Sequence, residues 1–278
     1  MNRSTRWNTV ACVFGVSILY LPLLAVAVLS LNAARFGTAW QGFTLDWYVR
    51  LWHNDVVLRA ARNTLILAIA STAISTLLGT MLALGIARFR WPRTIENAFS
   101  TIIHLPVVTP DIIFAAALVV AFRSLRALPG LFELGLTTMI IAHVTFQISF
   151  VALVARARLA TIEPEIEEAA RDLYAGTFDV VRKILLPLIA PGIVAGALLA
   201  FTLSLDDFVI SFFTSGPESA TLPIYIFSSL KRGLSPEIHA ISTVLFVVTA
   251  LLAVGLQVLS NRSATLSESV KSVQSVDK

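Results

Sequence analysis

Long runs of apolar residues, separated by short polar segments, dominate the hydropathy pattern of this chain. The runs cover residues 10–31, 63–87, 99–122, 135–155, 191–213 and 238–259. A helix needs about 20 apolar residues to cross the hydrocarbon core of a bilayer, and each run is of that order. None shows the ten-residue alternation of apolar and polar positions that is typical of membrane β-barrel strands. The pattern therefore predicts an all-α membrane protein with about six transmembrane helices.

The composition supports this prediction, because 56% of the 278 residues are hydrophobic and only 14% are charged. Soluble domains have about 45–50% apolar and about 25% charged residues. Arg3 and Arg6 precede a first apolar run that is longer than the roughly 7–15 residues of a signal peptide, so we expect an uncleaved first helix. The single cysteine, Cys12, excludes an internal disulfide.

The basic residues lie in short blocks between the runs, which is typical of a bacterial inner-membrane protein and not of a nucleic-acid-binding face. Blocks at 88–93 and 156–158 place their segments in the cytoplasm by the positive-inside rule. We therefore expect a cytoplasmic N-terminus (1–9), one transmembrane domain (10–260) and a cytoplasmic tail (261–278). Segment 32–62, rich in tryptophan, is expected to lie on the outer surface; ligand binding is the alternative.

The segment 160–190, between the fourth and fifth runs, has the pattern of a helical hairpin. Pro164 suits the first turn of a helix, and Gly176 is expected to end that helix in the left-handed conformation. Pro187 and Pro191 are expected to end or kink the second helix before the fifth span. The apolar side chains expected to share one side are Ile166, Ala169, Ala170 and Leu173 in the first helix, and Phe178, Val181, Ile184 and Leu185 in the second. Such a hairpin either docks another protein or packs on the cytoplasmic ends of the chain's own transmembrane helices.

The same segment resembles the EAA loop of permease subunits of binding-protein-dependent ABC importers, through Glu168-Ala169-Ala170 and the later Ile184, Leu186 and Pro187. One position departs from the family pattern, because Tyr174 occupies the usual glycine and the nearest glycine is Gly176. The resemblance implies the type I ABC importer permease fold, with this loop as the coupling helix that contacts an ATPase. The implied contact region comprises Glu168, Ala169, Ala170, Asp172, Tyr174, Gly176, Ile184, Leu186 and Pro187.

Other segments are similar to the second permease of spermidine/putrescine importers. They are LPVVTPDI (105–112), AHVTF (142–146), FTLSLDDFVISFFTSGP (201–217), TLP (221–223) and SPEIHA (235–240). The resemblance implies a homologous second permease, two ABC ATPases that carry ATP and Mg, and an extracytoplasmic solute-binding protein. It implies no cofactor in this chain. The implied cargo is a polyamine; another small amine, an amino-acid derivative or an aminophosphonate is the alternative.

Asp111, Asp206 and Asp207 fall inside predicted spans, where acidic residues are costly and usually face a cavity or a partner. Pro106 and Pro110 are expected to break the backbone before Asp111. As neighbours in one helix, Asp206 and Asp207 would point about 100° apart. One hypothesis is a transient site for an amine cation, with Phe208 and Phe212 supplying aromatic faces. The alternative is that the aspartates cap helix breaks or bond the partner permease.

The remaining polar residues of the spans indicate a structural role rather than a catalytic one. His104, His143 and Gln147 are expected to form interhelical hydrogen bonds. None of the four lysines lies in a G-x-x-x-x-G-K-[ST] motif, and the sequence contains no HExxH motif or metal-ligand cluster. We therefore expect a transport subunit without catalytic residues, driven by another chain's ATPase. The rivals are a self-contained cation channel or secondary carrier, and a membrane-embedded enzyme.

Overall fold

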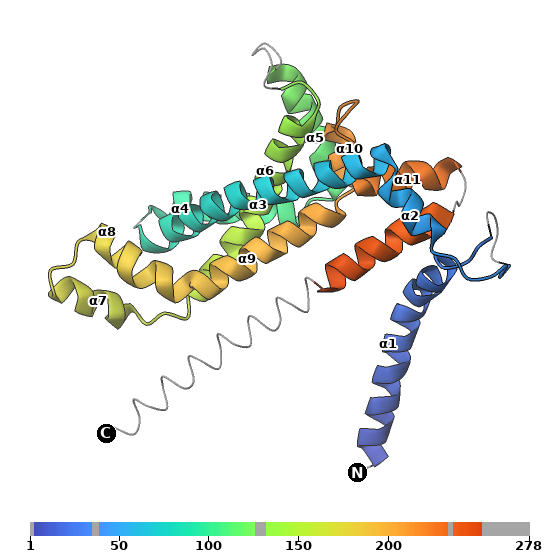
Figure 1. The fold of residues 1–278 in the computed structure, drawn as a ribbon. Coiled ribbons are helices and arrows are strands. Elements are labelled where there is room, and N and C mark those ends of the chain that lie inside the picture. The colour runs from blue at the N-terminus through green and yellow to red at the C-terminus, as the bar shows by residue number, and fades with distance from the viewer. Residues whose placement is uncertain (1–2, 35–38, 90, 126–131, 233–235, 252–278) are drawn as a thin grey trace. The chain divides into compact units, whose positions relative to one another are not determined.

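The computed structural model describes residues 3–34, 39–89, 91–125, 132–232 and 236–251, and in these ranges the chain is helical without a β-strand (Figure 1). This confirms the all-α prediction. The labelled helices are α1 (Arg3–Leu29), α2 (Asp46–Trp52), α3 (Asp55–Arg88), α4 (Arg93–Val108), α5 (Asp111–Ser124), α6 (Leu136–Leu159), α7 (Pro164–Asp172), α8 (Thr177–Asp179), the π-helical turn η2 (Val180–Leu185), α9 (Leu186–Asp206), α10 (Val209–Thr214) and α11 (Leu222–Arg232). One more apolar helix follows at Pro236–Leu251.

Four of the described helices are long and apolar enough to cross a membrane: Trp7–Leu29, Asp55–Arg88, Leu136–Leu159 and the continuous helix Thr177–Asp206. The bent pair α4 and α5 is a fifth candidate. The predicted sixth span includes residues 252–259, which lie outside the described residues, as does the predicted tail 261–278. A count of six crossings therefore stays a prediction.

The described residues form two compact units. The first unit contains α1, α2, the start of α3, α11 and Pro236–Leu251. In its core, Trp47 and Leu51 of α2 pack with Ala240 and Ile241, and Trp47 Nε1 donates a hydrogen bond of 2.8 Å to the carbonyl of Asn32. Trp52, on the same short helix, is exposed. Helix α2 is therefore amphipathic; that segment 32–62 lies on the outer surface stays a prediction.

The second unit, Ala61–Thr221, contains both candidate sites. Glycines allow α3 and α9 to approach α6 closely: a Cβ atom at Gly79 would lie 2.8 Å from Val151 Cβ, and one at Gly196 would lie 3.3 Å from Val151 Cα. Figure 1 shows α7 and α8 at one end of α9 and α10 at its other end. The unit thus connects an exposed hairpin to a region of broken helices through one long helix.

Two of the predicted spans are interrupted. In the run 99–122, α4 and α5 meet at 113° around Thr109 and Pro110, whereas Pro106 lies inside α4. The residue before a proline is driven out of the helical region, and Thr109 accordingly has φ −74° and ψ 130°. In the run 191–213, α9 ends at Asp206 and Asp207 is extended, with ψ 122°. The predicted break before Asp111 is therefore confirmed at Pro110 and wrong for Pro106. The expectation of one continuous helix over 191–213 is corrected.

Candidate functional site

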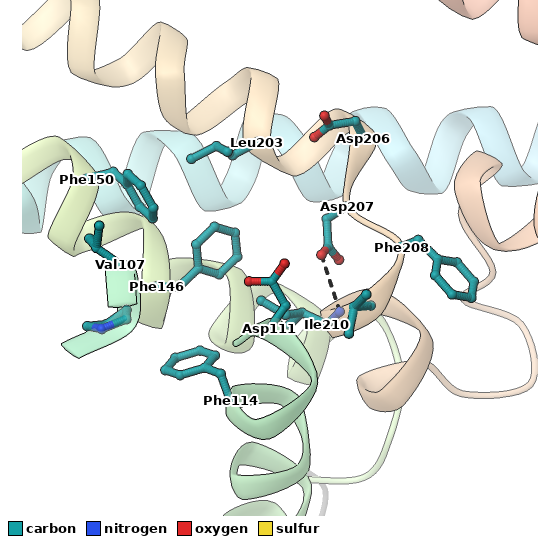
Figure 2. A pocket seen from close by; sticks show the side chains of 12 residues that line it. Val107, Asp111, Phe114, Phe146, Phe150, Leu203, Asp206, Asp207, Phe208 and Ile210 are labelled. Carbon is teal, nitrogen blue, oxygen red and sulfur yellow. Dashed lines mark hydrogen bonds between the residues drawn. The ribbon is translucent and has the colours of Figure 1, made fainter. Parts of the chain in front are cut away.

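A pocket of about 370 Å³ lies where α4, α5, α6, α9 and α10 come together in the second unit (Figure 2). Its lining is Pro106, Val107, Asp111, Phe114, Phe146, Phe150, Leu203, Asp206, Asp207, Phe208, Val209 and Ile210. The tertiary structure thus brings together four of the five residues predicted for a substrate pathway. Phe212, the fifth, is not in the lining, but its ring centroid lies 5.3 Å from that of Phe208.

Both helix breaks contribute an aspartate to this pocket. Asp111 is the first residue of α5, where a negative charge is favoured by the helix dipole. Asp207 caps α10, because its Oδ2 accepts a 2.7 Å hydrogen bond from the N–H of Ser211 and its Oδ1 accepts one of 3.3 Å from the N–H of Ile210. Asp207 therefore both caps α10 and lines the pocket.

The prediction that Asp206 and Asp207 are neighbours in one helix is wrong. Asp206 is the last residue of α9, whereas Asp207 lies in the extended link to α10. In Figure 2 their carboxylates project from opposite sides of the backbone, and the carboxylates of Asp207 and Asp111 point toward the same part of the pocket. The break, and not helical periodicity, decides where each carboxylate points.

The pocket combines negative charge with aromatic surface. It gathers carboxylates from Asp111, Asp206 and Asp207 and rings from four phenylalanines. Among the described residues, neither Asp111 nor Asp206 has an ion-pair partner. Carboxylates attract an amine cation by charge, and ring faces attract it by cation–π interaction. This arrangement therefore suits a small cationic amine.

Sequence reasoning missed the rings of Phe114, Phe146 and Phe150. Each lies in an apolar run, where a phenylalanine facing a cavity is indistinguishable from one facing lipid. Phe146 and Phe150 are four residues apart, so they share one face of α6, and their rings are in edge contact at 6.3 Å between centroids. This four-residue spacing was the only feature of the sequence that could have indicated a shared aromatic surface.

A buried polar network lies beside the pocket. His143 Nδ1 lies 2.8 Å from Ser204 Oγ, and Gln147 Nε2 donates to the carbonyl of Ala200 at 3.0 Å. Interhelical hydrogen bonding by His143 and Gln147 is thereby confirmed. The same prediction is wrong for His104, whose Nδ1 lies 2.6 Å from the carbonyl of Ser100, one turn earlier in its own helix.

The hairpin turns at Tyr174, not at Gly176. Tyr174 has φ 62°, whereas Gly176 has φ −69°, so the prediction of a left-handed Gly176 is wrong. The N–H of Tyr174 donates to the carbonyl of Arg171 at 2.9 Å, and that of Ala175 donates to the carbonyl of Ala170 at 3.0 Å. These two bonds define a Schellman motif, which needs positive φ at the residue after the cap of the helix. Because α7 ends at Asp172, that residue is Tyr174, the usual glycine position of the family.

The hairpin is packed at its root and exposed at its tip. Ala170, Val180 and Leu185 are buried against α4 and α6, so packing on the chain's own helices is observed. At the tip, Leu173, Tyr174 and Phe178 are 82%, 98% and 72% exposed, so the apolar stripes of the hairpin are not packed along their whole length. Because the tip is exposed, it is also available to dock another protein. Of the other implied contact residues, Glu168, Ala169, Asp172, Gly176 and Pro187 are exposed, and Ile184 and Leu186 are half-buried.

The second helix of the hairpin runs without interruption into α9, as the continuous helix Thr177–Asp206. Pro187 and Pro191 lie within it, so they do not end the helix; the other half of the expectation, a kink, stays a prediction. Pro187 follows the π-helical turn η2, and such local widening satisfies the backbone groups that a proline leaves unpaired.

These features belong to a known class of membrane protein. The fold matches a bacterial ABC transporter for the import of the acidic polysaccharide alginate (TM-score 0.71, 20% identity, covering 94% of this chain and 96% of that one). It also matches the MetNI methionine ABC transporter (TM-score 0.62, 18% identity, 77% and 97%). The fold is therefore that of an ABC importer permease.

The chain belongs to the family of binding-protein-dependent transport system inner membrane components, whose model matches residues 75–266. It is 38% identical over 242 residues to the spermidine/putrescine transport system permease protein PotC of Escherichia coli (strain K12), covering 87% of this chain and 89% of PotC. It is 39% identical over 240 residues to the putrescine transport system permease protein PotI of the same strain, covering 86% and 85%. The chain is thus a multi-pass inner membrane protein of a binding-protein-dependent transport system.

Proposed function

We propose that this chain is the channel-forming permease of an ABC importer for a polyamine such as spermidine or putrescine. The observation that carries the proposal is the pocket in which Asp111, Asp206 and Asp207 meet phenylalanine rings. Relatives at 38% and 39% identity are named for these cargoes. Another small amine or an amino-acid derivative remains the alternative cargo; an aminophosphonate is disfavoured, because its phosphonate would be repelled by the carboxylates.

In the proposed complex, this chain pairs with a homologous second permease. Two ABC ATPases bind ATP and Mg on the cytoplasmic side, and a solute-binding protein delivers cargo from outside. The hairpin and both termini lie in the cytoplasm, because the basic blocks at 88–93 and 156–158 favour that side. The exposed tip at Leu173, Tyr174 and Phe178 contacts an ATPase.

The continuous helix Thr177–Asp206 supplies the mechanical connection. At about 1.5 Å per residue it spans about 45 Å, from beside the hairpin tip to the pocket. Movement of the hairpin when the ATPases close is transmitted along this helix to Asp206. Nucleotide binding thereby shifts the population between outward-open and inward-open states of the pathway.

Substitution of the pocket aspartates tests the proposal. We expect Asp206→Asn and Asp207→Asn each to lower the maximal rate of labelled putrescine or spermidine uptake about tenfold, equivalent to about 1.4 kcal/mol. Asparagine removes the charge and keeps one oxygen, which can accept the shorter capping bond of Asp207, the 2.7 Å bond from the N–H of Ser211. Uptake is measured in cells that express the complete importer.

The control for this test is Glu133→Gln, which removes an exposed carboxylate outside the pocket and should leave uptake unchanged. An unchanged Michaelis constant and maximal rate in both aspartate variants would overturn the substrate pathway. The cargo is checked separately, by identifying the binding protein that co-purifies and measuring which amines raise its melting temperature.

A further inference from the structure

His143 of α6 lies fully buried beside the break between α9 and α10. Its two ring nitrogens contact opposite sides of that break. Nδ1 lies 2.8 Å from Ser204 Oγ on α9, and Nε2 lies 3.0 Å from Ser211 Oγ on α10. Nε2 also lies 3.3 Å from Asp207 Oδ2, in the link between the two helices. One imidazole therefore bridges the whole break.

The partners of the imidazole determine which nitrogen donates. A carboxylate only accepts hydrogen bonds, so the imidazole proton is on Nε2, the nitrogen that is near Asp207 and Ser211. Nδ1 then accepts the hydroxyl proton of Ser204, whose oxygen lies 3.4 Å from Ser71 Oγ. The hydrogen bond at one ring nitrogen thus sets the role of the other.

We propose that His143 is a positioning residue for Asp207, holding its carboxylate in the orientation that lines the pocket. Asp207 Oδ2 is constrained from two directions, by the N–H of Ser211 at 2.7 Å and by His143. The side chain of Asp206, at the exposed end of α9, contacts no such buried donor among the described residues. His143 thereby distinguishes the two adjacent aspartates. This inference rests on the proposed function of the pocket.

Two substitutions distinguish the contacts of Nε2 from those of Nδ1. The amide nitrogen of glutamine reaches approximately as far as Nε2, and that of asparagine approximately as far as Nδ1. His143→Gln retains a donor toward Asp207, so we expect it to keep at least about half of the wild-type maximal uptake rate. His143→Asn loses that donor, and its uptake should fall about tenfold, the scale of one hydrogen bond to a charged group.

Uptake of labelled putrescine and spermidine is measured with the complete importer, and the melting temperature of each purified complex reports folding. The matched controls are His104→Gln and His104→Asn, because His104 is exposed and bonds only within its own helix in the described structure. Both controls should transport as the wild type does. Equal losses in His143→Gln and His143→Asn would overturn the proposal.

A double-mutant cycle tests whether His143 acts through Asp207. We expect the double variant His143→Asn, Asp207→Asn to transport no more slowly than Asp207→Asn alone. If the fold-loss of the double variant equals the product of the two single fold-losses, the proposal is overturned. If the wild-type complex takes up neither amine, the proposed cargo fails. The same cycle is then measured by thermal unfolding of the complex, where non-additive shifts support the His143–Asp207 contact and additive shifts overturn it.

Discussion

Tyr174 has a backbone conformation that is unfavourable for a residue with a side chain. Its φ of 62° lies in the left-handed region, which costs about 1–2 kcal/mol for residues other than glycine. We therefore expect Tyr174→Gly to raise the free energy of unfolding by about 1 kcal/mol, measured by thermal denaturation of the purified complex.

Tyr174→Ala is the matched control, because alanine also removes the ring and keeps the Cβ atom that opposes positive φ. Its unfolding free energy should show no such gain, and an equal gain in both variants would contradict the strain argument. Both variants should weaken ATPase binding by a similar amount if the exposed ring contacts the ATPase as proposed.

At the scale of the element, an ion pair joins the hairpin to the long helix α3. Arg88, the last residue of α3, places Nη2 2.7 Å from Oε1 of Glu167 on α7. The side chains are only 27% and 13% exposed, so the pair is partly removed from water. Among the described residues, Nε and Nη2 of Arg88 form no hydrogen bond of acceptable geometry, so the contact of Nη2 with Glu167 is an ion pair. The pair links the proposed ATPase contact to α3 as well as to α9.

Charge substitution at this pair tests the link. Glu167→Gln leaves Arg88 without its counter-charge, so we expect a loss of about 1–3 kcal/mol in unfolding free energy, between the ranges for exposed and buried pairs. We also expect fewer amines transported per ATP hydrolysed, because hairpin motion reaches α3 less completely. Both quantities are measured on the reconstituted complex.

The exchanged pair, Arg88→Glu with Glu167→Arg, restores opposite charges and should recover part of both losses. The control is Lys183→Gln, which breaks the exposed Lys183–Asp179 pair, 72% and 48% exposed, and should have little effect on stability. If the exchanged pair is as impaired as the sum of its single variants, the ion pair does not provide the coupling.

At the scale of the whole molecule, the proposed function makes transport dependent on another chain. In the proposed complex, this chain supplies a pathway and a coupling hairpin, and the ATPase supplies the free energy; the sequence of this chain contains no P-loop. In proteoliposomes that contain the complete complex, we expect uptake to stop when ATP is omitted or replaced by a non-hydrolysable analogue.

A self-contained cation channel or secondary carrier would behave differently. It would purify without an ATPase, and amine uptake would follow the ion or cargo gradient after ATP depletion. Survival of uptake under these conditions would overturn the permease proposal in favour of that rival.

Sequence reasoning predicted most of the helical elements, because a span must be apolar over a length that the bilayer sets. The run 135–155 agrees closely with α6, Leu136–Leu159. The interruptions were harder to predict. Pro110 breaks its run while Pro106 and Pro191 lie inside helices. Proline is compatible with either outcome, since neighbouring groups decide whether the freed carbonyls are satisfied.

The sequence by itself determined that this chain crosses a membrane, and through the Glu168–Pro187 segment it indicated the family. Both follow from local properties: apolar length and a linear motif. Only the tertiary structure decided which residues meet at one pocket, that His143 contacts Asp207, and that Tyr174 forms the turn. These outcomes depend on contacts between residues such as His143 and Asp207, which are 64 positions apart in the sequence (207 − 143), and on where each helix ends. Local pattern does not contain that information.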